Sequence, residues 1–407
     1  MIIIKSPRIF PNTVNGVVEA LEQTFNNNLY ADKVVERLLK ENRKWGSRDR
    51  SFVAESTYEI IRNWRKLWAI YGNEPQFDTT SLTELFGIWW LSQGYKLPEW
   101  PAFQKLQDFE LEKRMTQIPK EIGITESYPE WFDARASKEL GTEWQNIAKA
   151  LNLAAPLTLR VNTLKTKRAE LQKTLAAEGI LAAPIKGFDE ALKLNSRTKL
   201  QHLKSFKDGL YEVQDAGSQK VADFVQAKPG DVVIDSCAGA GGKTLQLASA
   251  MQNKGLLVAM DVDVRKLREL EKRAKRNGVS IATTSLIKGN ASLKTYLEKA
   301  DRLLLDVPCS GTGVIKRDVD TKWKLQPNHL EKNIETQRMI LKNHTKMLKP
   351  GGSLVYATCS IFKSENEDQV QWFLDQFSKK YELEEELRLN PTADNDGFYM
   401  ARLRKLN

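Results

Sequence analysis

Residues 231–244 read DVVIDSCAGAGGKT, and this stretch decides the fold of the C-terminal half of the chain. A short apolar run ends at Asp235 and is followed by a loop that contains three glycines. Glycines let a backbone approach a ligand closely, and the N-terminus of a following helix offers unpaired N–H groups. We therefore expect a strand, a ligand-binding loop and a helix that runs through Ala250.

Apolar runs and helical patterns alternate along the rest of this half. The runs at 256–260, 302–306 and 353–357 are short and continuous, which is typical of strands buried on both faces. Lys349-Pro-Gly-Gly352 predicts a turn that ends the helix before the last run. The pattern predicts the α/β class, with a doubly wound, mostly parallel, Rossmann-like sheet over residues 226–407.

Two further regions precede this sheet. Residues 150–225 carry short β-like runs around a helix at 168–178, which predicts a small α+β module. Residues 1–145 carry apolar stripes at helical spacing and predict an all-helical N-terminal domain. Some of its basic residues fit either an RNA-binding surface or a solvated helix face over a tryptophan core; they are Arg43, Lys44, Arg48, Arg50, Arg62, Arg65 and Lys66.

Composition limits the class of protein. With 41% hydrophobic and 28% charged residues, the chain of 407 residues is globular rather than fibrous or disordered. Its most apolar stretch, Leu85–Leu91, is too short for a membrane span, and Met1–Pro7 does not resemble a signal peptide. Three cysteines favour free thiols and a reducing, cytoplasmic setting. A net charge of +10 favours a nucleic acid as partner over a merely solubilising surface; we expect a monomer and no metal site.

The glycine loop fits neither of two common nucleotide patterns. A phosphate-binding loop needs glycine where Cys237 stands, and a dinucleotide loop needs glycine where Thr244 stands. Asp261 follows the next strand, 19 residues after Gly242, where an acidic residue accepts hydrogen bonds from ribose hydroxyls, although it could also cap a helix. We therefore expect S-adenosylmethionine. Its candidate ligands in the loop are Cys237, Ala238, Gly239, Ala240, Gly241, Gly242 and Lys243.

Two thiols follow two apolar strands. Cys309 lies in Asp306-Val-Pro-Cys-Ser-Gly-Thr-Gly313 and Cys359 lies in Tyr356-Ala-Thr-Cys-Ser360. The carboxyl ends of neighbouring parallel strands meet at one edge of a sheet, so both thiols could face one substrate, although a free cysteine is often only a small buried hydrophobe.

A thiol beside S-adenosylmethionine has a specific use. Carbon 5 of a pyrimidine is a poor nucleophile until a thiolate adds to carbon 6, which points to cytosine or uracil as the methyl acceptor. Lys243 and Lys316 are candidates to assist ionisation of the thiol, and Asp306 could bond the ring nitrogen or the exocyclic amine of the base, or only the cofactor.

These motifs resemble the Nol/Nop/Sun family of RNA cytosine-5 methyltransferases, and most of all its RsmB-type (Fmu/Sun) branch. The resemblance is strong over residues 155–407. It also runs through Leu159-Arg-Val-Asn-Thr163, Val213-Gln-Asp-Ala-Gly-Ser218, Leu348-Lys-Pro-Gly-Gly352 and Asp396-Gly-Phe-Tyr399. It implies a class I methyltransferase domain, an RRM-like small module and, more faintly, a NusB-like helical domain.

The resemblance also implies roles for single residues. Cys359 would form the covalent bond to carbon 6 of cytosine, and Cys309 would help to release the methylated product. Asp261, Asp306 and the position of Asn290 would line the cofactor site beside the loop. Asn290 stands where the family usually has aspartate, and Val319 stands where it usually has proline, in a segment, Lys316–Asp320, that is expected to touch RNA.

The sequence thus predicts an RNA cytosine-5 methyltransferase, with ribosomal RNA as the substrate by family analogy alone. Transfer RNA is a further substrate that the sequence does not separate from it. The alternative in another class is an RNA-binding ribosome-assembly factor that has lost turnover, and the two intact cysteine motifs argue against it.

Overall fold

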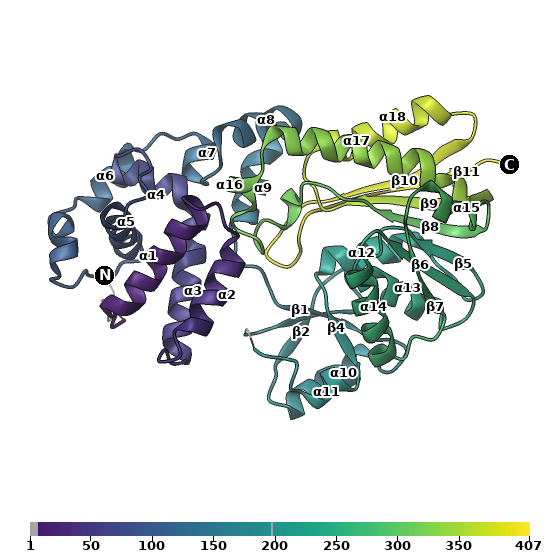
Figure 1. Cartoon of the computed structure of the whole chain (residues 1–407), viewed down its shortest axis with the longest axis horizontal. Coiled ribbons are helices and arrows are strands. Elements are labelled where there is room, and N and C mark those ends of the chain that lie inside the picture. Colours follow the sequence, from purple (N-terminus) through teal and green to yellow (C-terminus); the bar gives the residue numbers. More distant parts are fainter. Residues whose placement is uncertain (1–6, 197) are drawn as a thin grey trace. The chain divides into compact units, whose positions relative to one another are not determined.

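The computed structural model describes residues 7–196 and 198–407, whose contacts form two compact units (Figure 1). The first unit contains the chain up to Asn152 together with Ile315–Leu325. The second contains Leu153–Val314 and Gln326–Asn407. The start of the chain, where the sequence predicts no signal peptide, lies outside the described residues. Within the described part, no helix is both long and apolar enough to cross a membrane.

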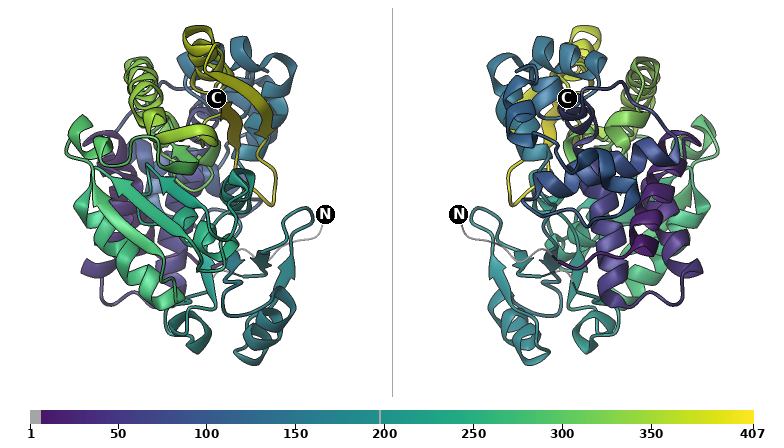
Figure 2. Two further views of the ribbon diagram at one scale, coloured as in Figure 1. Left: turned by 90° about the vertical axis from the view of Figure 1, so that its right-hand side faces the viewer. Right: turned by 90° about the vertical axis from the view of Figure 1, so that its left-hand side faces the viewer.

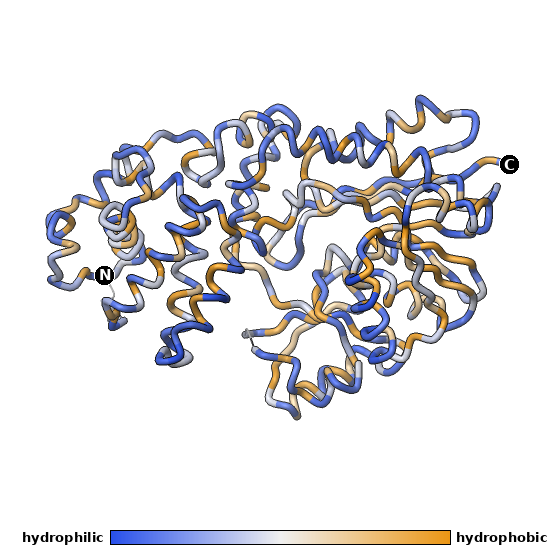
Figure 3. Tube along the Cα trace, in the orientation of Figure 1, coloured by the Kyte–Doolittle hydropathy of each residue, from blue (hydrophilic) through white to orange (hydrophobic). Residues whose placement is uncertain are grey.

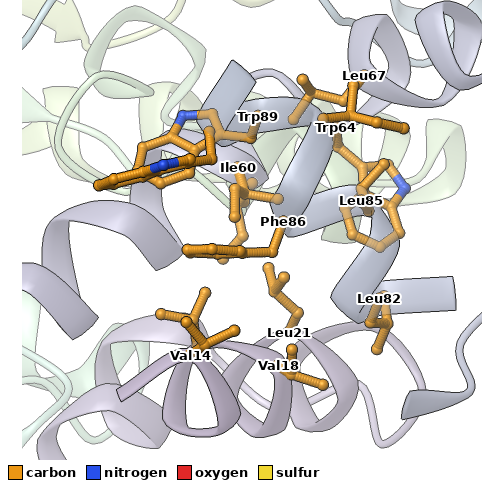
Figure 4. Packing of buried hydrophobic residues seen from close by; sticks show 14 of the residues in the cluster. Val14, Val18, Leu21, Ile60, Trp64, Leu67, Leu82, Leu85, Phe86 and Trp89 are labelled. Atoms are coloured by element: carbon orange, nitrogen blue, oxygen red, sulfur yellow. The ribbon is translucent and has the colours of Figure 1, made fainter. Parts of the chain in front are cut away.

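The first unit is built from helices, as its apolar stripes predict. Asp78 caps one of them by accepting a hydrogen bond from Ser81 N at 3.0 Å. Figure 4 shows the buried core, in which Phe86, Trp89 and Ile60 face Val14 and Leu21. The helices are α1(Pro11–Phe25), α2(Ala31–Glu41), α3(Ser47–Arg62), α4(Trp64–Tyr71), α5(Thr79–Ser92), η1(Pro101–Leu106), α6(Leu111–Gln117), α7(Ile122–Thr125), α8(Glu130–Leu140), η2(Gly141–Glu143), α9(Trp144–Leu151) and α16(Thr321–Lys324).

Three of the basic residues that the sequence offered as an RNA surface have structural partners in this unit. Arg50 donates to the carbonyl of Trp45 at 3.0 Å and also to the carbonyls of Leu39 and Asn42, at the end of α2. Arg65 donates to Tyr128 O at 2.8 Å, and Arg62 is buried. For these three, helix support is therefore the better interpretation.

The small module of the second unit forms a four-stranded antiparallel sheet in the order β2-β3-β1-β4. Its chain order, strand–helix–strand–strand–helix–strand, is ferredoxin-like and agrees with the predicted small α+β module. Leucines from α10 and the strands form its core. The elements are β1(Thr158–Val161), α10(Arg168–Ala177), β2(Ala182–Pro184), β3(Ala191–Leu194), α11(Lys204–Lys207) and β4(Tyr211–Val213).

The large sheet of the second unit has seven strands in the order β10-β11-β9-β8-β5-β6-β7. The five strands from β9 to β7 run parallel, and β11 and β10 add an antiparallel edge that the sequence did not predict. The two sheets of this unit are drawn in Figures 1 and 2, and Figure 3 shows hydrophobic residues along the central strands. The strands are β5(Val232–Asp235), β6(Leu256–Asp261), β7(Ala282–Leu286), β8(Ala300–Asp306), β9(Leu348–Thr358), β10(Tyr381–Leu389) and β11(Phe398–Lys405).

Helices pack on this sheet and carry residues of the site. They are α12(Ala216–Val225), α13(Gly242–Ala250), α14(Val264–Asn277), α15(Asn290–Lys294), α17(Pro327–His344) and α18(Glu367–Phe377), with short helical turns at η3(Thr312–Val314), η4(Thr345–Met347) and η5(Lys363–Glu365). This mixed sheet flanked by helices confirms the predicted Rossmann-like fold.

One predicted turn lies inside a strand. Lys349–Gly352 belongs to β9, where the pairing with β8 shifts register between Ala300 and Arg302. Gly351 has a φ of +74°, so the strand accommodates an irregularity there that favours glycine.

The segment 315–325 interrupts the second unit along the chain but packs within the helical unit. The Asp320 carboxylate accepts a hydrogen bond from Ala31 N at 2.9 Å. The Lys322 side chain is fully buried and donates to the carbonyl of Arg62 at 2.8 Å. Trp323 Nε1 donates to the carbonyl of Ile61 at 2.8 Å.

These contacts place most of the stretch Lys316–Asp320, which is expected to touch RNA, within the helical unit. Lys316, Val319 and Asp320 are buried, and Val319 belongs to the hydrophobic core of the helical unit. Only Arg317 and Asp318 of this stretch are exposed. Val319, where the resemblance expects proline, thus belongs to a hydrophobic core, and contact of this stretch with RNA stays a prediction.

Candidate active site

A cleft of about 590 Å³ lies where β5, β6 and β8 end, at the carboxyl edge of the parallel strands. This volume falls in the range of small-molecule sites. Its lining residues are Ser236, Cys237, Ala238, Gly239, Asp261, Val262, Lys266, Ile287, Gly289, Asn290, Leu293, Asp306, Val307, Pro308, Thr336, Met339, Ile340, Asn343 and His344.

The glycine loop forms one wall of the cleft. Gly239 has a φ of +55° and Gly241 a φ of +89°, and both are conformations that favour glycine. The Asp261 carboxylate accepts hydrogen bonds from Gly239 N and Asp263 N, each at 2.8 Å. Asp261 thus fixes the loop, and its remaining lone pairs can accept hydroxyl groups from a ligand.

The lining of the cleft fits an adenosyl sulfonium cofactor. Apolar side chains supply surfaces suited to a flat heterocycle; they are Val262, Ile287, Leu293, Met339 and Ile340. The carboxylates of Asp261 and Asp306 supply acceptors and negative charge suited to a cationic ligand. A backbone cradle of phosphate-binding type is not needed for such a ligand, which agrees with the loop pattern.

Lys243 and Asp306 form an ion pair beside the cleft, with 2.7 Å between Lys243 Nζ and Asp306 Oδ2. Burial works to lower the pKa of Lys243, but the charge and hydrogen bond of Asp306 outweigh it and leave that pKa raised. Cys359 also contributes to this rise. The ammonium group is therefore charged at neutral pH and lies within the electrostatic reach of the thiol.

The two predicted thiols lie side by side. Cys309 Sγ and Cys359 Sγ are 3.4 Å apart, at the ends of neighbouring strands β8 and β9. The hydrogen bond to Cys359, together with burial, raises the pKa of the Cys309 thiol well above its usual range. Either sulfur can donate the hydrogen bond between them, and the raised pKa of Cys309 favours the arrangement in which Cys309 is the donor.

Two polar residues that sequence reasoning missed support these turns. Glu365 is 0% exposed and accepts hydrogen bonds from Ser310 N at 2.9 Å and Gln337 Nε2 at 3.1 Å, as well as from Ser310 Oγ. Asn366 donates to Ser360 O at 2.9 Å and bonds Thr358 Oγ1. Glu365 thus stabilises the turn that carries Cys309, and Asn366 stabilises the turn that carries Cys359.

A close approach of two glycines fixes the Cys359 turn from another side. Gly313 N donates to Cys359 O at 2.8 Å, and Gly397 N donates to Gly313 O at 2.9 Å. A Cβ at Gly313 would lie 2.3 Å from Gly397 O and 2.9 Å from Cys359 O. Glycine is therefore required at position 313 by close packing of backbone against backbone.

The structure brings most of the predicted site residues together. Cys237, Ala238, Gly239, Asp261, Asn290 and Asp306 line the cleft. Ala240, Gly241 and Gly242 complete the loop behind it, and Lys243 follows as the partner of Asp306. Lys316 is buried in the helical unit, whereas Lys243 belongs to the same unit as the two thiols.

Residues of α17 form a wall of the cleft that the sequence did not predict. Thr336, Met339, Ile340 and Asn343 follow the i, i+3, i+4, i+7 spacing of one helix face. That spacing was visible in the sequence, but it is equally typical of a helix that packs on a core.

Two buried titratable groups flank the loop. Burial lowers the pKa of His344 to about 4, and its Nδ1 lies 2.7 Å from Ser236 Oγ. Burial raises the pKa of Asp235 to about 7, against the opposing effect of a hydrogen bond from Thr244 Oγ1 at 2.6 Å. His344 is thus neutral at physiological pH.

Family models match two parts of the chain. Residues 222–404 match the model described as 16S rRNA methyltransferase RsmB/F. Residues 128–201 match the ferredoxin-like domain of RsmF/B-like methyltransferases.

Three relatives show how far the likeness extends. Ribosomal RNA small subunit methyltransferase B of Vibrio cholerae is 37% identical over 61% of this chain and 57% of its own length. The chain thus spans about three fifths of that relative. A crystal structure of a methyltransferase homolog from Pyrococcus horikoshii is 30% identical, with a TM-score of 0.62 over 70% of this chain and 98% of the other. The structure titled PH0851 shares the fold over 98% of this chain and 100% of its own, with a TM-score of 0.75 at 24% identity.

Proposed function

The chain belongs to the RsmB/F family of 16S rRNA methyltransferases, and from that premise we propose that it methylates carbon 5 of a cytidine in small-subunit ribosomal RNA. S-adenosylmethionine is its methyl donor, and the cleft at the strand ends is the donor site. The observation that carries the proposal is the pair of thiols 3.4 Å apart, one of which directly follows Pro308 in the lining of that cleft.

Cys359 is the nucleophile in this proposal. Its sulfur accepts a hydrogen bond from the Cys309 thiol and lies in the field of the Lys243 ammonium, and both interactions favour the thiolate. The thiolate adds to carbon 6 of the cytosine, which makes carbon 5 electron-rich. S-Adenosylmethionine, when bound, supplies an electrophilic methyl group.

Asp306 is placed to orient the base. Its carboxylate lines the cleft and is held by Lys243, so its free oxygen can bond the ring nitrogen or the exocyclic amine of cytosine. As the sulfur adds, the ring nitrogen takes up a proton from water, and the Asp306 carboxylate accepts a hydrogen bond from the resulting N–H, which stabilises the charge that develops in the ring.

Cys309 assists release in the same geometry. Product forms when water takes the proton from carbon 5, the electron pair of that C–H bond restores the double bond between carbons 5 and 6, and the bond between carbon 6 and the Cys359 sulfur breaks. The Cys309 thiol again donates a hydrogen bond to the Cys359 sulfur as that sulfur leaves with its electron pair, which makes it a better leaving group.

A target inside a duplex has to be unstacked into the cleft, at a cost of a few kcal/mol. The cost of unstacking is lowest for a cytidine in an RNA loop or in a partly assembled subunit. We therefore propose that the substrate is RNA of an immature small subunit in the cytoplasm. The protein acts as a monomer in this proposal.

A transfer assay tests the function. Purified protein is mixed with methyl-labelled S-adenosylmethionine and small-subunit ribosomal RNA transcribed without modifications. We expect label at carbon 5 of one cytidine, located by nuclease digestion and mass spectrometry. Protein that binds the cofactor and the RNA but leaves no label on cytosine would contradict the proposal, because that behaviour belongs to an assembly factor without turnover.

A further inference from the structure

Two arginines hold the glycine loop, although neither belongs to the lining of the cleft. Arg160, on β1 of the small sheet, donates from Nη1 to Gly242 O at 2.5 Å. Arg273, on α14, donates from Nη1 to Ala240 O at 2.8 Å. Two carbonyl groups, one within the glycine loop and one at the first residue of α13, are therefore fixed by buried or half-buried cations.

The small sheet also supplies the acid that positions the second arginine. Glu212, on β4, is 3% exposed, and its Oε2 lies 2.9 Å from Arg273 Nη2. Arg276 and Asn277 of α14 bond the other carboxylate oxygen. Glu212 thus fixes the α14 residue whose second nitrogen reaches the loop.

Arg160 is an unusual residue for a small sheet because it is only 1% exposed. Burial lowers its pKa to about 10, so it stays charged at neutral pH. A buried cation is costly unless it is paired and hydrogen-bonded, and apolar side chains would fill such a place at less cost. Its hydrogen bonds go to the loop carbonyl and to Gln214, so the charge is used to fix backbone at the cofactor site.

Two of the three glycines at the loop, Gly239 and Gly242, face open space, whereas Gly241 packs closely against Leu270. A Cβ at Gly239 or Gly242 would meet nothing within 4 Å. Glycine backbone loses the most conformational freedom when it is ordered. A loop that is already held in its binding shape avoids that entropic cost when the ligand binds.

We propose that the ferredoxin-like module is a positioning part of the cofactor site, in which Arg160 and the Glu212–Arg273 pair hold the glycine loop in the shape that binds S-adenosylmethionine. Arg160, Glu212 and Arg273 are positioning residues, since they act through the loop. The proposal rests on the proposed function only in taking the cleft as the site of that cofactor. It gives the small module a task that does not depend on RNA.

Isothermal titration calorimetry on the full chain tests this role with S-adenosylmethionine and with S-adenosylhomocysteine. We expect Arg160→Gln to weaken the binding of both about tenfold or more and Arg273→Gln by a smaller factor, because each loses a charged hydrogen bond. The matched control is Arg168→Gln, since Arg168 also donates to a carbonyl, Phe188 O at 3.0 Å, but only within the small module. The control is expected to bind as the wild type does.

Kinetics and stability separate positioning from folding. We expect the KM for S-adenosylmethionine to rise in Arg160→Gln and Arg273→Gln, while the KM for RNA stays as in the wild type and the Tm matches that of the control. We expect Arg273→Lys to recover part of the affinity. If Arg160→Gln fails to fold, the binding data for Arg273→Gln decide the question. The Arg273 side chain is 18% exposed, so its replacement leaves fewer buried polar groups without a hydrogen bond.

Folded variants that bind the cofactor as tightly as the wild type would overturn the positioning role. Wild-type protein that binds neither compound would overturn the proposed function itself, together with this role. Wild-type protein that binds the cofactor but does not methylate RNA would contradict only the proposed function.

Discussion

The thiols of Cys309 and Cys359 share one hydrogen bond. The neighbouring Cys359 and burial raise the pKa of Cys309, which favours its protonated form as the donor of this hydrogen bond. The roles of nucleophile and releasing thiol stay those that the family resemblance implies.

Substitution of each thiol should give a different phenotype. We expect Cys359→Ala to abolish methylation, because no other group can add to carbon 6, while its Kd for S-adenosylmethionine stays near the wild-type value. We expect Cys309→Ala to retain the addition step but to release product slowly. Single-turnover assays with labelled cofactor, beside calorimetric binding, check both. Methylation by Cys359→Ala at a rate above that of Cys309→Ala would reverse the two roles.

Glu365 offers a second prediction at this scale. Its carboxylate satisfies the buried Ser310 N–H and the Gln337 amide, so Glu365→Ala should leave donors without partners and cost about 3–5 kcal/mol of unfolding free energy. Glu365→Gln should cost less but lower kcat, since the turn that carries Cys309 loosens. Urea unfolding and steady-state kinetics measure the two effects.

The control for Glu365 is Glu367→Gln, which removes an acid two residues away that pairs with Arg388. Its kcat is expected to stay near that of the wild type. Equal kcat values for Glu365→Gln and Glu367→Gln would contradict the positioning of the Cys309 turn by Glu365.

Residues with a recognisable motif were predictable, and residues that support them were not. Cys309, Cys359 and Asp261 each follow an apolar run, so sequence alone brings them to one edge of a sheet. Glu365 and Arg160 have no such signal, because a buried charge is recognised only when its partners are known. The exposed Asn290 lines the cleft as the resemblance implies, but its effect on affinity stays a prediction.

At the scale of elements, α17 links the cofactor cleft to a titratable group. His344 ends this helix and is buried, with a pKa of about 4 in the folded state against 6.5 for the exposed side chain. Between these values the unfolded chain binds a proton that the folded chain does not. The free energy of unfolding therefore falls as the pH is lowered from 6.5 towards 4, by up to about 3 kcal/mol.

His344→Gln tests this pH dependence. Urea unfolding of the wild type and the variant is followed by circular dichroism between pH 4 and 7.5. The difference between their unfolding free energies removes the contributions of the other titrating groups, which both proteins share. We expect the stability advantage of the wild type to be present above pH 6.5 and to shrink as the pH falls. A difference that is constant across this range would show that His344 is not held neutral.

Strands were more predictable than their irregularities. The buried strands β5, β6 and β8 are continuous apolar runs, and the prediction placed them within one or two residues of their observed ends. Lys349–Gly352 was predicted as a turn that ends the preceding helix, but β9 already begins at Leu348, and pairs with β8 lie on both sides of these four residues. The β10–β11 edge was missed because β10 exposes acidic residues on its outer side and lacks an apolar run.

At the scale of the whole molecule, the chain leaves the catalytic unit after the Cys309 turn and returns at α17. Between these points, residues 315–325 pack in the core of the helical unit. Domain limits predicted from the sequence alone do not assign residues 315–325 to the helical unit, because motifs of the second unit lie on both sides of the segment. The predicted limits 1–145, 150–225 and 226–407 stay predictions for that reason.

Trp323 tests the role of this segment. Its ring packs against the helical core, and we expect Trp323→Ala to lower the unfolding free energy of the helical unit by about 2–4 kcal/mol. Nine of the ten tryptophans lie in that unit, so fluorescence-detected urea unfolding reports on it. The exposed-surface variant Lys33→Ala is the control, with an expected change within about 0.5 kcal/mol. Equal midpoints for the two variants would show that the segment is not part of this core.

The most direct test of the account is to locate the covalent bond between protein and RNA. Cys309→Ala protein is incubated with S-adenosylmethionine and unmodified small-subunit ribosomal RNA, denatured, and digested with nuclease and protease for mass spectrometry. The account predicts a cytidine derivative attached to the peptide that contains Cys359. Attachment at another residue, or product formation by the Cys359→Ala variant without any adduct, would contradict it.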